Sequence, residues 1–130
     1  MRFNQEELFE ELAPAGTYVA RIVGAREKKS RQGHPMVAVW LRLQGRRGAG
    51  RGVADYFVTD GVPPAALTIS RRRLLALVRS CGLEPPLDSD LDVKLLADRV
   101  VEVDVAIAPG EGGPRNVVQR YRQAPADAAS

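Results

Sequence analysis

Three stretches near the start of the chain alternate between hydrophobic and polar residues, as half-buried β-strands do. They cover residues 17–28, 36–43 and 52–58. In the first stretch the alternation turns Tyr18, Ala20 and Ile22 toward the core. Gly33 and Gly45 lie between successive stretches, and glycine is typical of tight hairpin turns. The pattern therefore predicts a meander of three antiparallel strands.

The second of these strands has two different faces. Its aliphatic face consists of Val37, Val39, Leu41 and Leu43, and its other face carries Ala38, Trp40 and Arg42. If the aliphatic face is buried, the only tryptophan of the chain points away from the core, beside an arginine. The alternative is a Trp40 side chain buried in the core or beneath an N-terminal helix, since tryptophan is highly buried on average.

The second half of the chain predicts one main helix and two more strands. Thr68 or Ser70 is a candidate N-cap for a helix that begins near Arg71, and Gly82 is a candidate glycine just after its end. The apolar face of this helix would consist of Leu74, Leu75, Leu77, Val78 and Cys81. A strand follows in which Val101, Val103, Val105 and Ile107 face the core, and the last strand covers 116–122.

The order of these elements favours an OB-fold, a five-stranded Greek-key barrel, here with its helix between strands three and four. An α+β sandwich with the helix on one face of the sheet is the alternative. We expect an acidic N-terminal helix at 1–13, an OB-like domain at 14–123 and a disordered tail at 124–130. A chain of 130 residues can build one core without disulfides or metals.

Positive charge is concentrated in the first half of the expected sheet. From Arg21 to Arg51 there are nine Lys or Arg residues and one acid, Glu27, for a net charge of +8. The whole chain has a net charge of +3, so the remaining residues sum to −5. Such asymmetry indicates a negatively charged partner, for example a nucleic acid. Sixteen of the nineteen basic residues are arginine, so an arginine-rich codon bias alone can also raise the isoelectric point.

The chain offers few residues for catalysis or metal binding. His34 and Cys81 are its only histidine and cysteine, and they fall in different elements, so they do not form a structural zinc site. Cys81 lies on an apolar helix face, which predicts a buried thiol rather than a nucleophile. Asp88, Asp90 and Asp92 lack the glycine and terminal glutamate of a calcium-binding loop. We therefore expect that the protein is not an enzyme and that it has no catalytic residue, no metal and no cofactor.

Several short motifs are spread along the expected domain. They are Pro14-Ala15-Gly16-Thr17-Tyr18, Glu27-Lys28-Lys29-Ser30 followed by Gly33-His34-Pro35-Met36, and Gly50-Arg51 leading to Asp55-Tyr56. Together with the helix at 73–83 and the closing segment 114–121, they resemble a family of small phage and prophage proteins of unknown function, over about residues 14–123. The sequence departs from that pattern at Ala54, where a large apolar residue is usual, and in its arginine-rich second turn. The resemblance implies an OB-fold-like protein that binds single-stranded DNA.

The basic turns and the aromatic residues fall where an OB-fold binds nucleic acid, on strands two and three and on the loop between strands one and two. Cations hold the backbone of a single strand, and aromatic rings stack on its bases. The candidate phosphate contacts are Arg21, Lys28, Lys29, Arg31, Arg42, Arg46, Arg47 and Arg51. The candidate stacking rings are Trp40 and Tyr56, with Tyr121 a weaker choice. The low aromatic content of 5% predicts modest, salt-sensitive affinity.

These features favour a non-enzymatic protein that coats single-stranded DNA, or RNA, with little sequence preference. Its setting would be phage replication or recombination, with proteins of those processes as further partners. The alternative is a protein-interaction or assembly module whose basic face binds an acidic protein surface. No apolar run approaches the roughly 20 residues that span a bilayer, and the N-terminus lacks the apolar stretch of a signal peptide. We therefore expect a cytoplasmic protein without a membrane partner.

Overall fold

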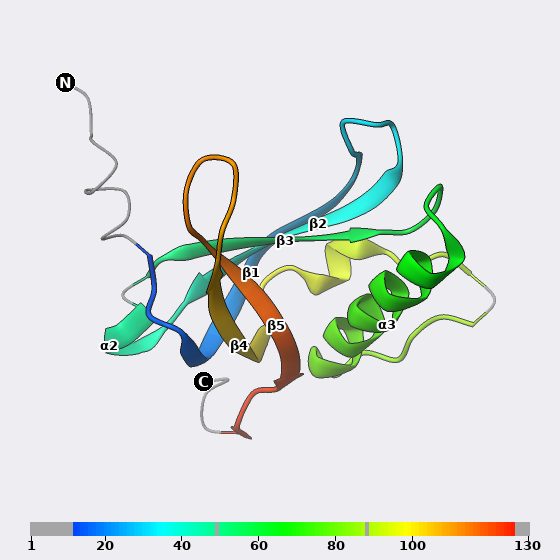
Figure 1. The fold of residues 1–130 in the computed structure, drawn as a ribbon. Coiled ribbons are helices and arrows are strands. Elements are labelled where there is room, and N and C mark those ends of the chain that lie inside the picture. Colours follow the sequence, from blue (N-terminus) through cyan, green and yellow to red (C-terminus); the bar gives the residue numbers. More distant parts are fainter. Residues whose placement is uncertain (1–11, 49, 88, 127–130) are drawn as a thin grey trace.

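The computed structural model describes residues 12–48, 50–87 and 89–126, which form five strands and one long helix (Figure 1). The strands are β1 (Gly16–Lys29), β2 (Pro35–Leu43), β3 (Gly52–Val58), β4 (Val100–Ala108) and β5 (Arg115–Gln123). The long helix is α3 (Pro64–Ser80), and the two short helical turns are α2 (Gly45–Gly48) and η1 (Val93–Leu96). Nearly all of the expected N-terminal helix, and most of the expected tail, lies outside the described residues.

All five strands form one open antiparallel sheet in the order β3-β2-β1-β4-β5. This confirms the expectation of a mainly β protein with one main helix. β1 is the longest strand and holds the sheet together, because its first half pairs with β4 and its second half with β2. The register of β1 and β2 shifts between Ile22 and Gly24, which marks a β-bulge. The bulge turns Arg26 and Lys28 to the face opposite that of Ile22.

The core lies between the inner face of the sheet and α3. Its buried side chains include Ala20, Ile22, Val37, Val39, Leu41, Leu43, Val53, Phe57, Leu77, Val78, Cys81, Val101, Val103 and Val105. The residues that the alternation of the first two strands turns inward are all buried, which confirms that pattern. Ile107, which the pattern also turns inward, is 44% exposed. It pairs with Asn116 beside the β4–β5 turn, past the end of the core.

The long helix α3 begins earlier than the sequence predicts. Pro64 lies in its first turn, where proline fits because its N–H is not needed and its φ is already helical. Thr68, Ser70 and Arg71 therefore lie inside the helix rather than at its start, so the predicted N-cap is wrong. Gly82 follows the helix with a φ of +78°, as the sequence predicts for a glycine at that position.

The outermost strands β3 and β5 are joined by a polar network beside α3. Asp55 on β3 accepts a hydrogen bond from the Tyr121 hydroxyl on β5, at 2.6 Å. The same carboxylate oxygen forms an ion pair with Arg73 of α3, also at 2.6 Å. Arg73 in turn donates to the Val118 carbonyl at 3.1 Å, and the rings of Phe57 and Tyr121 have centroids 6.1 Å apart. These contacts draw the two edges of the open sheet toward each other.

Candidate nucleic-acid interface

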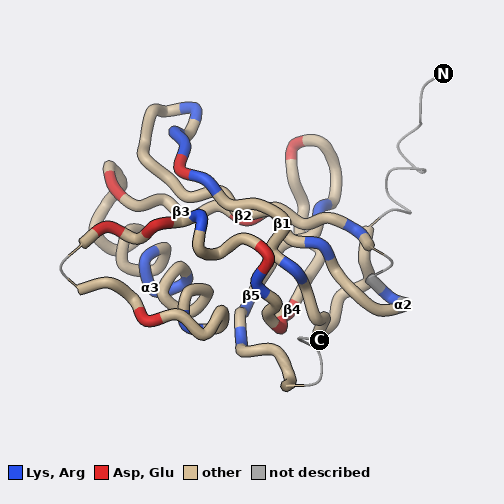
Figure 2. The backbone as a smooth tube through the Cα atoms, turned by 180° about the vertical axis from the view of Figure 1, so that it is seen from behind, with Lys and Arg blue, Asp and Glu red and all other residues tan. Residues whose placement is uncertain are grey.

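The side of β1, β2 and β3 that points away from the core, called the outer face below, combines cations with aromatic rings. Side chains that lie opposite each other in a strand ladder point to the same face, so the register defines its members. They are Arg21, Gly24, Arg26, Lys28, Met36, Ala38, Trp40, Arg42, Gly52, Ala54, Tyr56 and Val58. Four of these residues are basic and none is acidic. Figure 2 shows basic positions along the β1–β2 hairpin.

Trp40 lies on the outer face and is only partly buried, as the alternation of its strand predicts. Its cross-strand neighbours are Gly24 on β1 and Ala54 on β3, whose small size leaves room for the indole. A Cβ atom built at Gly24 would lie 3.6 Å from Cε3 of the indole, so the ring covers that glycine. The guanidinium carbon of Arg26 lies 5.3 Å from the ring centroid, within the range of a cation–π interaction.

A second pair of ring and cation lies in the neighbouring row of the sheet. Tyr56 is 42% exposed, and Nζ of Lys28 lies 5.6 Å from its ring centroid. Between the pairs lies Ala38, opposite Arg26 on one side and Tyr56 on the other. Ala38 has no exposed surface, although it is on the outer face, so its larger neighbours cover it. The two pairs therefore form one continuous layer over the sheet.

Four other candidate cations lie at the ends of the outer face. Arg21 and Arg42 pair across β1 and β2 at one end, and Arg21 donates a hydrogen bond to the Asp98 carbonyl at 2.9 Å. Lys29 and Arg31 are exposed at the other end, at the turn between β1 and β2. Of the ten candidate site residues, the outer face thus brings together Arg21, Lys28, Trp40, Arg42 and Tyr56, with Lys29 and Arg31 beside it.

The cations of the second basic turn do not join the outer face as a group. Arg47 lies 5.9 Å from the centroid of the Tyr18 ring and donates to the Ala15 carbonyl at 3.1 Å, so it packs against the start of β1. Arg51 donates to the Arg47 carbonyl at 3.1 Å. The side chain of Arg46 lies outside the described part of the chain. The arginine-rich turn is thus partly engaged in holding the end of the sheet.

Arg26 is a site residue that the sequence pattern does not identify. Continued alternation from Ile22 would turn Arg26 toward the core, and the bulge before Gly24 reverses that direction. The available signal in the sequence is Gly24 itself, because a glycine inside a strand often marks a bulge.

The same side of the sheet carries paired charges farther on, over β4 and β5. Arg122 on β5 binds Glu102 at 2.9 Å and Asp104 at 2.6 Å, both on β4. Thr17 on β1 donates its hydroxyl to Asp104 at 2.7 Å. The hydrogen bonds from Arg122 and Thr17 hold the pKa of Asp104 well below its usual range. Glu102 and Asp104 on β4 therefore form ion pairs with Arg122, whereas the outer face of β1, β2 and β3 holds cations and no acids.

The two candidate reactive side chains, Cys81 and His34, lie in different places. Burial raises the pKa of the Cys81 thiol to about 11, so the thiol stays protonated near neutral pH. His34 lies in the β1–β2 turn, against Gly61.

Within residues 12–48, 50–87 and 89–126, no group of three or more His, Cys, Asp or Glu side chains could hold a metal ion. No helix in the same ranges is long and apolar enough to cross a membrane.

Comparison with known proteins assigns no family to this chain. No family model matches it, and no curated protein is similar to it at a significant level. The resemblance to small phage proteins therefore stays a prediction that depends on the sequence motifs alone.

Proposed function

We propose that this protein binds single-stranded nucleic acid through the outer face of β1, β2 and β3, and that its ligand is single-stranded DNA of phage replication or recombination. One observation carries the proposal: two rings, Trp40 and Tyr56, each lie beneath a cation on a face without acids. A base that stacks on either ring would displace the cation from it, and the displaced cation can contact a neighbouring phosphate. Binding of this kind requires no catalytic group.

We also infer that the open sheet is an OB-fold barrel whose gap is bridged by side chains. The strand order supports this, because β1 is shared between β2 and β4. The hydrogen bond from Tyr121 to Asp55 across the gap favours a barrel over an α+β sandwich. OB-folds bind oligonucleotides on strands two and three and on the loop between strands one and two. In this chain that loop carries Lys29 and Arg31.

The composition of the outer face supports modest affinity with little sequence preference. Two rings provide few stacking positions, and four cations provide few phosphate contacts. Asn, Gln, Asp and Glu are absent from the residues of this face, so its Arg and Lys side chains, which can contact guanine, are the charged or amide groups available to read bases. The affinity should therefore depend on salt much more than on base sequence.

Titration with a labelled oligo(dT) of about 20 nucleotides tests the proposal. We expect saturable binding that quenches Trp40 fluorescence. If all four cations of the outer face contact phosphates, the affinity should fall about 50-fold between about 50 and 200 mM salt, given the slope for single strands. The absence of salt-sensitive binding would contradict the proposal.

Polyglutamate of similar charge serves as the control polyanion, because it offers negative charge without bases. Equal binding of polyglutamate would favour the second candidate function, a protein-interaction module with a basic face. Weaker binding of polyglutamate than of oligo(dT) is the result that the stacking rings predict.

A further inference from the structure

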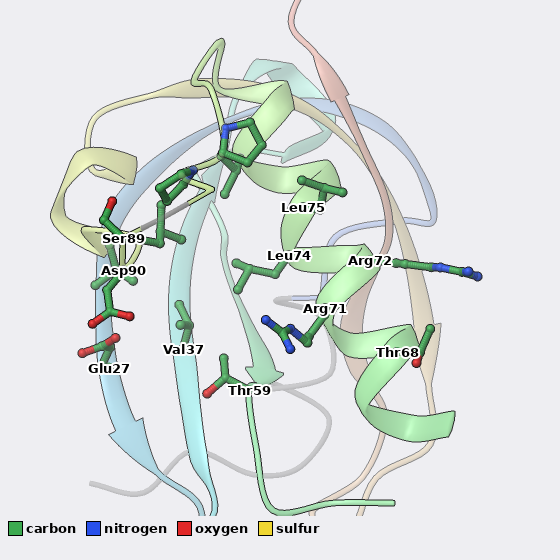
Figure 3. A pocket seen from close by; sticks show the side chains of 15 residues that line it. Glu27, Val37, Thr59, Thr68, Arg71, Arg72, Leu74, Leu75, Ser89 and Asp90 are labelled. Atoms are coloured by element: carbon green, nitrogen blue, oxygen red, sulfur yellow. The ribbon is translucent and has the colours of Figure 1, made fainter. Parts of the chain in front are cut away.

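A groove of about 690 Å³ lies on the inner side of the β1–β2 hairpin, between that hairpin, α3 and the connector after α3 (Figure 3). Its size falls within the range of about 300–1,000 Å³ that is usual for ligand sites. The apolar side chains that line it include Val37, Leu74, Leu75, Val78, Leu91 and Val93. None of the 15 lining residues is aromatic. The groove is therefore an aliphatic surface distinct from the outer face.

Charged side chains lie on two sides of the aliphatic residues that line the groove. In Figure 3, Glu27 of β1 and Asp90 of the connector lie on one side, and Arg71 of α3 points in from the other. All three are exposed. Among the residues that the structure describes, these three side chains have no hydrogen-bonding or ion-pairing partner. Two carboxylates and one guanidinium are thus left to interact with a ligand.

The bulge in β1 explains why an acid faces this groove. Glu27 lies between Arg26 and Lys28, so the alternation of the strand turns it to the opposite face. Its partner in the ladder is Val37, which is buried and also lines the groove. The β1–β2 hairpin therefore presents cations on one face and an acid on the other, and the two surfaces do not overlap.

We propose that the groove binds a peptide segment of a partner protein that combines a Lys or Arg, one or two aliphatic residues and an Asp or Glu. The basic side chain would pair with Glu27 and Asp90, and the acidic one with Arg71. The aliphatic residues would cover Leu74 and Leu75. Charge complementarity of this kind fixes the orientation of a bound peptide.

Nucleic acid matches this groove less well than a peptide of mixed charge does. The two carboxylates repel phosphates, and the lining offers no ring on which a base could stack. The proposal goes beyond the nucleic-acid function and does not depend on it, because the groove lies on the other face of the hairpin. If both proposals hold, the protein can bind a single strand and a partner at the same time.

Two synthetic pools of octapeptides test the proposal on the full chain, without DNA. In the first pool, a Lys-Leu-Leu-Glu or Glu-Leu-Leu-Lys core is embedded in random sequence; in the second, Gln replaces Lys and Glu. Two-dimensional NMR of the labelled protein should show that the first pool shifts the resonances of Glu27, Leu74 and Asp90. It should leave the Trp40 indole unchanged. The second pool should need at least about tenfold more peptide for the same shifts.

Matched variants separate the groove from unspecific binding. Glu27→Gln with Asp90→Asn should weaken binding of the charged pool at least about tenfold, whereas Glu111→Gln, in the β4–β5 turn, should not. Arg71→Gln should weaken it as well, and Arg79→Gln should not, because Arg79 lies on the same helix but does not line the groove.

Three results would overturn the groove proposal: equal binding of the two pools, shifts that map to the outer face, or unchanged binding by the Glu27→Gln/Asp90→Asn variant. All the substituted side chains are exposed, so the variants should keep the fold, and the unshifted resonances report on it. The peptides are measured without oligo(dT). Failure of oligo(dT) to bind the same proteins would therefore refute only the nucleic-acid function and leave the groove proposal standing.

Discussion

The guanidinium carbon of Arg26 lies 5.3 Å from the centroid of the Trp40 ring, on the face of the sheet that points away from the core. The contact exists because the bulge between Ile22 and Gly24 reverses the alternation of β1. It places a cation over the ring before any ligand arrives. A base that stacks on Trp40 would displace this guanidinium, which can then contact a neighbouring phosphate.

Removal of either ring should weaken nucleic-acid binding. Trp40→Ala and Tyr56→Ala should each lower the affinity for oligo(dT) about 5- to 150-fold, which corresponds to about 1–3 kcal/mol for each stacked base. Fluorescence anisotropy of the labelled oligonucleotide measures both. Tyr56→Phe is the matched control, because it keeps the ring and should bind nearly as the wild type does. If Tyr56→Phe loses as much affinity as Tyr56→Ala, stacking does not explain the role of this residue.

The hydrogen bond from Tyr121 to Asp55 should contribute measurably to stability. Tyr121→Phe removes only the hydroxyl, and we expect the free energy of unfolding to fall by about 1.5–3 kcal/mol, as is usual for hydrogen bonds to charged groups. Urea denaturation measures the change. Tyr56→Phe alters a tyrosine that is 42% exposed and should leave stability unchanged. A Tyr121→Phe protein as stable as the wild type would show that this bond does not help to hold β3 near β5.

The buried thiol of Cys81 should make stability depend on pH in the alkaline range. Burial raises its pKa to about 11, above the value of about 8.5 for an unfolded cysteine, so the folded state holds the proton more strongly. Its contribution to stability is fully present below about pH 8.5 and is lost as the pH rises toward 11. By pH 10 the loss should reach about 1–2 kcal/mol.

Urea denaturation of wild type and Cys81→Ala at pH 7 and pH 10 checks this pH dependence. The pKa of the Tyr121 hydroxyl is also raised, mainly by burial and by Asp55, and Cys81 is the last of its causes. Both proteins share the larger causes, so the difference between their pH slopes reports mainly on the cysteine. Parallel slopes would contradict the expected burial of the thiol.

The features that depend on local periodicity could be predicted from the sequence. Alternation with a period of two identifies the buried face of β2 and places Trp40 on the other side. Gly82 after α3 is equally local, because a left-handed conformation at a helix end favours glycine. The start of α3 was missed because Thr68 and Ser70 are better N-caps than Pro63, and the two prolines before them are typical of a loop.

The features that depend on distant contacts could not be predicted. Arg47 belongs to an exposed basic turn in the sequence, and only the folded chain places it against Tyr18. The groove brings Glu27 and Asp90 to one side, although a large part of the domain separates them in the chain. The position of Arg26 has a local cause instead, a single bulge that a regular strand pattern does not contain, although Gly24 is a sign of it.

Charge reversal on the outer face tests the central claim most directly. Arg26→Glu with Lys28→Glu alters the cations of both ring pairs, whereas Arg79→Glu with Lys94→Glu makes the same change in net charge on α3 and η1. In salt titrations with oligo(dT), the first variant should bind much more weakly, with a salt slope reduced by about 1.4 for two lost phosphate contacts. The second variant should keep an affinity close to that of the wild type. Equal weakening of both variants, or no weakening of the first, would contradict a binding surface on the outer face.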